Sequence, residues 1–253
     1  MDKIKKKKLK DLLLERGLCD NEQKARSLIL SGSVLVNEIK VNGENRLFKE
    51  DVQIRLLHVI PEYVSRGAYK LLGGFEAFPV NVQDKICLDL GASTGGFTEI
   101  LLANGARKVY AFDVGYGQLA GKLRNDPRVV VHDRFHIKNL SLSCLDEKDI
   151  SELFIVMDLS FISLKRVFPT IQNLKLEYSE LLMEGISLLK PQFECKGQEL
   201  EKGIVRDPRV HFKVIRKIWR FLKNHAGVRH LQIADSPIRG NSGNREFLLY
   251  WKM

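Results

Sequence analysis

The chain lacks any long apolar run. A helix that crosses a membrane needs about 20 mostly apolar residues, and no stretch here approaches that length. The basic start is followed by Asp11–Glu15, where three leucines stand between two acids, so the apolar core of a secretion signal is absent. We therefore expect a cytoplasmic protein with no membrane partner.

Cysteine is scarce and scattered. The four cysteines are widely separated, at positions 19, 87, 144 and 195. No pair has the spacing of a metal site, and nothing suggests a disulfide framework. We expect a reduced protein that binds no metal.

Acidic residues are outnumbered by basic ones. The chain has 41 Lys and Arg against 31 Asp and Glu, a formal net charge of +10. Such an excess indicates a polyanionic partner, either nucleic acid or an anionic membrane surface, and charge alone does not choose between them. With 253 residues, the chain can form one large core and a small additional domain.

The first sixty residues predict two helices, over 4–16 and from about 21 to Gly32, followed by short strands at 34–36, 39–43 and 52–56. This α+β order resembles the alpha-L RNA-binding domain named after ribosomal protein S-four. The resemblance rests on Arg16-Gly17-Leu18, Gln23–Ile29, Gly32–Val34, Val36-Asn37 and Val41–Gly43.

In that family the second helix and the hairpin face RNA. The resemblance implies phosphate contacts by Arg16, Lys24, Arg26 and Lys40, with Arg66 as a further candidate in the Ser65-Arg-Gly67 stretch. A solvated face is the alternative. The run Lys5–Lys8 predicts either a flexible basic arm or a solubility tail. We divide the chain into an RNA-binding domain at 1–60, a linker at 61–66 that contains Pro61, and a second domain at 67–253.

The stretch from Lys85 to Phe97 carries the most information. An apolar run ends in Asp89, and a glycine-rich turn and a helical pattern follow. The spacing fits neither the dinucleotide fingerprint nor the P-loop. It resembles the first motif of class I methyltransferases, and a carboxylate there suits the cationic cofactor S-adenosyl-L-methionine. The predicted cofactor residues of this loop are Asp89, Gly91, Ala92, Ser93, Thr94, Gly95, Gly96 and Phe97.

Two later strands also end in carboxylates. Asp113, followed by Val114, is placed to bind the ribose hydroxyls, and Asp133, followed by Arg134, to reach the adenine amino group. Serial carboxylates at strand ends predict an α/β fold with a doubly wound, mostly parallel sheet.

Further strands are expected over 153–158, 186–190 and 245–250. With these, the sequence resembles the TlyA (haemolysin A) family and, more distantly, the FtsJ-type 2'-O-methyltransferases. The supporting stretches are Ser65–Gly67, Asp89–Phe97, Asp113–Leu119, Asp158–Ser163, Lys190–Glu194, Gly203–Asp207 and Gly243–Phe247.

FtsJ-like enzymes use a Lys-Asp-Lys-Glu tetrad, and the matching positions are Lys70, Asp158, Lys190 and Glu246. The resemblance implies methyl transfer from S-adenosylmethionine to a ribose 2'-hydroxyl of ribosomal RNA, at a cytidine of 23S or 16S RNA or both, within ribosomal subunits. The family usually carries Thr and Asn where this chain has Phe135-His136.

The residue types suit this chemistry. A ribose hydroxyl is a poor nucleophile and needs a base and strict alignment. Lys190 is assigned to the attacking oxygen, with Lys70 as the neighbouring cation and the two acids as orienting groups. Surface salt bridges are the alternative for each residue taken alone.

Other functions fit less well. A haemolysin-like pore would need membrane-inserting segments, and a non-catalytic RNA-binding protein would lack part of the tetrad. Tyr116, Phe161 and Phe193 are open between stacking on a nucleotide and packing. A basic amphipathic helix at 210–222 is either solvated or faces RNA. A monomer is favoured, although the sequence does not determine the oligomeric state.

Overall fold

The computed structural model describes residues 6–19, 21–30, 32–41, 43, 46–57, 63–147, 150–240 and 242–253. The chain divides into two compact units, Met1–Glu62 and Tyr63–Met253. Residues 61 and 62 of the expected linker, and residues 4 and 5 of the first expected helix, lie outside the described part.

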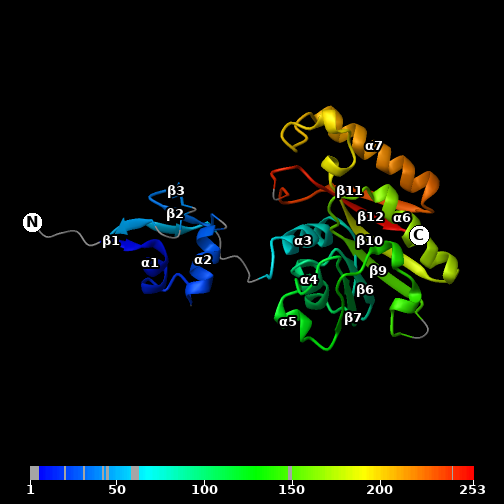
Figure 1. Ribbon diagram of the computed structural model, residues 1–253, viewed down its shortest axis with the longest axis horizontal. Coiled ribbons are helices and arrows are strands. Elements are labelled where there is room, and N and C mark those ends of the chain that lie inside the picture. Colours follow the sequence, from blue (N-terminus) through cyan, green and yellow to red (C-terminus); the bar gives the residue numbers. More distant parts are fainter. Residues whose placement is uncertain are drawn as a thin grey trace, which may run out of the picture. The chain divides into compact units, whose positions relative to one another are not determined.

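The described residues of the first unit form two helices and small antiparallel sheets (Figure 1). Helices α1 and α2 pack their apolar faces, with Leu9, Leu13 and Ile29 fully buried, against the three-stranded sheet β3-β2-β5. The bounds are α1 Leu9–Glu15, α2 Glu22–Leu30, β2 Val34–Val36, β3 Ile39–Lys40 and β5 Ile54–Leu56. The role of this unit in RNA binding stays a prediction.

Three residues of the basic run, Lys6–Lys8, form a strand and not a free arm, and Lys5 lies outside the described residues. β1, Lys6–Lys8, pairs antiparallel with β4, Leu47–Lys49. Lys7 Nζ lies 2.7 Å from Glu15 Oε2 and 3.1 Å from Glu50 Oε1, so its charge is compensated. The expected tail, and the expected helix over these three residues, are therefore wrong.

The second unit is built on a seven-stranded sheet of order β11-β12-β10-β9-β6-β7-β8. β12 runs antiparallel to both of its neighbours, and all other pairs are parallel. The bounds are β6 Ile86–Leu90, β7 Lys108–Phe112, β8 Val129–His132, β9 Glu152–Met157, β10 Leu182–Leu189, β11 His230–Asp235 and β12 Phe247–Lys252. The predicted doubly wound, mostly parallel sheet is confirmed, and β11 is a strand that the sequence analysis missed.

Helices cover both faces of this sheet (Figure 1). Alternate residues of the central strands enter opposite cores: in β9, Ile155 joins the core beneath α6 and α7, and Val156 joins the core beneath α3 and α4. The bounds are α3 Gly67–Ala77, α4 Gly96–Ala103, α5 Gly121–Arg124, η1 Ile137–Asn139, η2 Leu142–Cys144, α6 Leu164–Glu177, η3 Pro191–Phe193, η4 Gly197–Glu199 and α7 Pro208–His225.

Because β6 to β10 run parallel, their carboxyl ends meet at one edge of the sheet. The loops that follow them begin at Gly91, Asp113, Asp133, Asp158 and Lys190. This edge therefore gathers the residues singled out by sequence. None of the described helices is long and apolar enough to span a membrane.

Candidate active site

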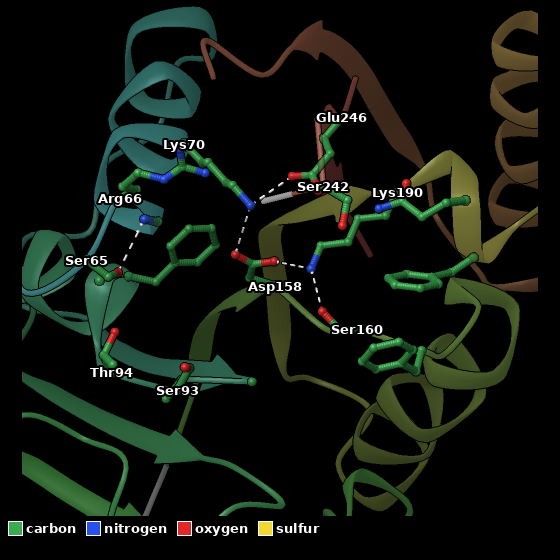
Figure 2. Close-up of a pocket in the computed structure, with 18 residues that line it drawn as sticks. Ser65, Arg66, Lys70, Ser93, Thr94, Asp158, Ser160, Lys190, Ser242 and Glu246 are labelled. Carbon is green, nitrogen blue, oxygen red and sulfur yellow. Dashed lines mark hydrogen bonds and ion pairs between the residues drawn. The ribbon is translucent and has the colours of Figure 1, made fainter. Parts of the chain in front are cut away.

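Four charged side chains from four elements meet at the carboxyl edge of the sheet (Figure 2). Lys70 comes from α3, Asp158 follows β9, Lys190 follows β10, and Glu246 precedes β12. Lys70 Nζ lies 2.8 Å from Glu246 Oε2 and 3.3 Å from Asp158 Oδ2, and Lys190 Nζ lies 2.6 Å from Asp158 Oδ1. Asp158 thus bridges the two lysines, so the structure brings the predicted tetrad together.

The tetrad is largely withdrawn from solvent. Lys70 and Lys190 are each 8% exposed, and Glu246 is 3% exposed. Charges buried to this degree are tolerated only when they are paired, and here two cations face two carboxylates. Gly240 leaves room for the arrangement, because a Cβ at that position would lie 2.3 Å from Glu246 Oε1.

Lys190 has a second partner that the sequence analysis missed. Its Nζ donates to Ser160 Oγ at 2.9 Å. Ser160 follows Asp158 by two residues in the same loop, inside the Asp158–Ser163 stretch, so its proximity to the tetrad was the available signal. The ammonium of Lys190 is therefore held from two points of one loop.

A cavity of about 580 Å³ opens onto the tetrad. This volume falls in the range of small-molecule sites. Its other lining residues include Ser65, Arg66, Gly67, Gly91, Ala92, Ser93, Thr94, Gly96, Phe97, Ser160, Phe161, Gln192, Phe193 and Ser242. We call it the tetrad cavity.

A second cavity of about 600 Å³ lies beside it and extends over the ends of β6 and β7. The two cavities share one wall, formed by Gly91, Ser93, Asp158, Ser160 and Phe161. The remaining lining includes Leu90, Phe112, Asp113, Val114, Gln118, Phe135, His136, Ile137, Leu159, Ile162 and Arg166. We call it the loop cavity. The arrangement can hold two ligands in contact across a common boundary.

Residues 63–253 match the model of the FtsJ-like methyltransferase family. The chain belongs to this family. YqxC of Bacillus subtilis, named as a candidate rRNA methyltransferase, is 41% identical over 247 residues, which cover 97% of this chain and 85% of that protein. The Mycobacterium tuberculosis protein named 16S/23S rRNA (cytidine-2'-O)-methyltransferase TlyA is 39% identical, covering 94% of this chain and 87% of its own length.

A solved structure from Streptococcus thermophilus, described as a hemolysin candidate, is also similar. It shares 32% identity with a TM-score of 0.72, covering 99% of this chain and 89% of that chain. The predicted resemblance to FtsJ-like and TlyA proteins is confirmed by these matches.

Two glycines shape the loop that follows β6 in the methyltransferase domain. Gly91 has φ +88° and Gly95 has φ +99°, in the left-handed region that favours glycine. A Cβ on Gly91 would lie 3.0 Å from the carbonyl oxygen of Asp158, so this loop approaches the tetrad loop backbone to backbone. Glycine at these two positions therefore allows the loop to turn sharply and to pack against the tetrad loop.

Asp113 ties two of the loops together. Its Oδ2 accepts from the backbone N–H of Ser93 at 2.8 Å, and its Oδ1 accepts from the N–H of Gly115 at 2.7 Å. It lines the loop cavity next to Val114. The structure therefore places this pair of predicted cofactor residues against a cavity.

Asp89 lies behind the loop. It is fully buried and accepts from Thr98 N at 2.9 Å and from Thr98 Oγ1 at 2.7 Å. Burial raises the pKa of Asp89 to about 7, against the lowering effect of these hydrogen bonds. Asp89 lines neither cavity, so its observed contacts hold the first turn of α4.

Asp133 and Arg134 also lie away from both cavities. Asp133 Oδ2 accepts from Arg124 Nη2 at 2.8 Å, and the Arg134 guanidinium lies 4.3 Å from the ring centroid of Tyr116. The next two residues, Phe135 and His136, do line the loop cavity. The positions where this chain departs from the family pattern are thus the ones that face the cavity.

A buried carboxylate links the two loops that carry the lysine and the aromatic side chains. Glu194 is 5% exposed; its Oε2 accepts from Ser163 Oγ and its Oε1 from the N–H of Leu164, both at 2.7 Å. Phe161 is 91% exposed with φ +63°, and its ring centroid lies 5.1 Å from that of Phe193. Glu194 ends the Lys190–Glu194 stretch that supports the family resemblance, but the sequence did not reveal its hydrogen bonds to Ser163 and Leu164.

The candidate RNA contacts of the first unit differ in their surroundings. Arg16 donates to the carbonyls of Val52 and Glu50 at 2.7 and 2.5 Å, which fastens the end of α1 to the segment before β5. Arg26 and Lys40 are exposed, and Lys24 is partly exposed. Arg66, in the second unit, lines the tetrad cavity.

Proposed function

We propose that this chain transfers the methyl group of S-adenosylmethionine to a ribose 2'-hydroxyl of ribosomal RNA. The observation that carries the proposal is the tetrad, with Asp158 bridging Lys70 and Lys190 at the wall between two cavities. Methyl transfer needs a donor site and an acceptor site in contact, with a base at the junction. The two adjoining cavities would supply the donor and acceptor sites, and the tetrad would supply the base.

The loop cavity suits the cofactor. Its volume of about 600 Å³ accommodates a nucleoside, and Gly91 in its lining presents no side chain to a ligand. Asp113 would hold the ribose hydroxyls, as acidic residues do in Rossmann-type sites, and Phe135 and His136 would flank the base. S-Adenosylmethionine supplies the electrophilic methyl group when it is bound.

The part of the tetrad cavity around Lys190, Phe161 and Phe193 suits the target nucleotide, and the part lined by Ala92, Thr94, Gly96 and Phe97 would hold the methionine end of the cofactor, as the sequence predicts. We assign Lys190 Nζ to the attacking 2'-oxygen. After its ammonium has released a proton, the neutral amine would accept the hydroxyl proton as the C–O bond forms and the S–CH3 bond of the donor breaks, leaving the neutral thioether. Asp158 and Ser160 hold that nitrogen in place at 2.6 and 2.9 Å. Lys70 Nζ, held by Glu246 at 2.8 Å, lies 3.3 Å from the bridging carboxylate of Asp158 and would add a second positive charge beside Lys190. Phe161 and Phe193 offer stacking faces for the base.

The substrate follows from relatives and charge. The M. tuberculosis relative is named for cytidine-2'-O methylation of 16S and 23S rRNA, and we propose the same nucleoside and RNA class here, in cytoplasmic ribosomal subunits. The net charge of +10 suits a polyanionic substrate. In this proposal residues 1–60 form an S-four-like RNA-binding domain, with Lys24, Arg26 and Lys40 at its RNA face.

The direct test is transfer of tritiated methyl from S-adenosylmethionine to purified 30S and 50S subunits and to their naked RNAs. We expect label in at least one substrate, and nuclease mapping should locate it at a cytidine 2'-oxygen. Label on a base nitrogen or carbon would refute the ribose chemistry. Cofactor binding without label on any of these substrates would refute ribosomal RNA as the target.

A further inference from the structure

Helix α7 is basic along its whole length. Its 18 residues include no Asp or Glu. Six of its lysine and arginine side chains are exposed: Arg209, Lys213, Arg216, Lys217, Arg220 and Lys223. The positive side chains along this helix repel one another, and a bound polyanion relieves that repulsion.

The two faces of α7 differ in burial. His211, Val214, Ile218 and Leu222 are buried against the sheet, at the three- and four-residue spacing of one helix face. Phe212, Arg216 and Arg220 recur every four residues on the outer face, so their side chains are neighbours along it. We call these three residues the α7 stripe.

Most of the other cations on α7 already have partners. Arg209 pairs with Asp207 at 2.9 Å, Lys213 pairs with Glu199 at 2.6 Å, and Lys217 donates to a backbone carbonyl at 2.7 Å. For Arg216 and Arg220, the described part of the chain contains no hydrogen-bond or ion-pair partner. Two guanidinium groups one turn apart are thus available to an external anion.

Phe212 is the second observation. It is 66% exposed, although a phenylalanine side chain gains about 1.5–3 kcal/mol from full burial. It lies one turn before Arg216, toward the first residues of α7. An exposed aromatic ring beside arginines is the combination that binds unstacked nucleic-acid bases together with phosphates.

The start of α7 is tied to the active site. Asn244, two residues before Glu246, donates to Gly203 O at 3.0 Å and accepts from Val205 N at 2.9 Å. Lys217 Nζ donates to the carbonyl of Glu194, four residues beyond Lys190. The loop before α7 and Lys217 within it therefore contact the segments that carry Glu246 and Lys190, which links this helix to the elements around the tetrad cavity.

We propose that the α7 stripe binds the RNA strand flanking the methylated nucleotide, with Arg216 and Arg220 on its phosphates and Phe212 stacked on an unpaired base. This inference rests on the proposed function, which supplies RNA as the substrate. RNA suits the stripe better than a membrane does, because a membrane-bound helix inserts an apolar face, whereas the apolar face of α7 is buried in the protein.

The test uses the full chain and two RNA probes, a fluorescein-labelled 20-nucleotide oligocytidylate and purified 50S subunits. In R216Q/R220Q, the slope of log affinity against log salt should flatten by about 1.4, since each single-strand phosphate contact contributes about 0.7. In Phe212→Ala, affinity should fall about 5- to 10-fold with the slope unchanged, because stacking is not ionic.

R107Q/R128Q is the charge control. It removes the same formal charge from two exposed arginines that directly precede β7 and β8, where Arg107 pairs with Glu147 and Arg128 with Asp126, and its salt slope should equal that of the unmodified chain. Equal slopes for R216Q/R220Q and this control would overturn the proposal. So would an R216Q/R220Q defect seen only in binding to phosphatidylglycerol vesicles.

The two proposals fail separately. The binding assays need no cofactor, so a flattened slope with no methyl transfer to any RNA would count against the reaction alone. Normal methyl transfer with an unchanged slope would count against the stripe alone. If both proposals hold, R216Q/R220Q should raise the KM for 50S subunits about 10-fold with kcat changed less than about 2-fold, since phosphate contacts position the RNA.

Discussion

The methyltransferase sheet carries a lysine–carboxylate cluster at each of its two edges, and the clusters have the same composition. The tetrad lies at the carboxyl edge. The amino-edge cluster also has two lysines and two acids: Lys85, Glu152, Glu184 and Lys252. Its shortest ion pair, Lys85 Nζ to Glu184 Oε1, is 2.7 Å, as close as those of the tetrad.

The surroundings of the two clusters differ. No tetrad side chain is more than 19% exposed, whereas those of Glu152 and Lys252 are 47% and 50% exposed. The tetrad borders a cavity of about 580 Å³, and the amino-edge cluster one of about 230 Å³. Residue types and distances alone thus do not separate the proposed catalytic cluster from the amino-edge cluster. The two differ in burial beside a ligand-sized cavity, at the edge where loops follow parallel strands.

The largest expected effect is at Lys190. Lys190→Ala removes the assigned base and should slow methyl transfer about 100- to 10,000-fold in single-turnover assays, the usual contribution of a positioned general base. Cofactor binding, measured by calorimetry, should persist. A normal rate in a folded, cofactor-binding variant would show that the base is misassigned.

Lys85→Ala is the counterpart at the other edge. It leaves Glu184 with fewer donors, so the free energy of unfolding in urea should fall by about 1–3 kcal/mol, while methyl transfer changes less than about 2-fold. A large loss of methyl transfer in this variant, with the free energy of unfolding unchanged, would contradict a purely structural role of the amino-edge cluster.

Glu194 tests whether loop spacing matters as much as the tetrad itself. Glu194→Ala removes both hydrogen bonds to the start of α6, and kcat should fall about 10- to 100-fold with little change in cofactor affinity, because small misplacements of reacting groups are costly. Glu194→Gln keeps an acceptor for the Leu164 N–H and should recover most of the rate. Equal defects in the two variants would assign the effect to charge instead of position.

The smallest effect is the pH response of the amino edge. Burial acts to raise the pKa of Glu184, but hydrogen bonds from Lys85, Tyr250 and Lys252 outweigh it and hold that pKa below its ordinary value. The stabilisation is therefore present above the ordinary glutamate range, near pH 4 to 5, and is lost as the pH falls through the lowered pKa. The free energy of unfolding in urea should be lower at pH 3.5 than at pH 7. In Glu184→Gln this difference between the two pH values should be smaller.

Much of the fold was predictable, because parallel strands buried on both faces appear as apolar runs that end in polar residues. Helix α3 was missed because Gly73 and Gly74 lower its intrinsic helix propensity. Both are needed for contact: a Cβ would lie 2.7 Å from Pro237 at Gly73 and 2.9 Å from Ile186 at Gly74. β1 was missed because three consecutive lysines form a strand only through pairing with Leu47–Lys49.

The site was predictable in its residues more than in their contacts. Strand ends and family motifs located the tetrad, since the carboxyl edge gathers those ends. The exact strand ends were not predictable: Asp89 lies inside β6 and accepts from Thr98, whereas Asp113 follows the last residue of β7 and lines a cavity. Ser160 and Glu194 acquire their partners only when the loops after β9 and β10 fold together.

The wall between the two cavities has a kinetic consequence. Its five residues, a glycine, two serines, an aspartate and a phenylalanine, line both cavities, so ligands in the two cavities would lie next to each other. Direct transfer of the methyl group between them requires donor and acceptor to be bound at the same time. The proposed reaction then follows sequential kinetics, through a ternary complex, and a product left in either cavity delays the next turnover.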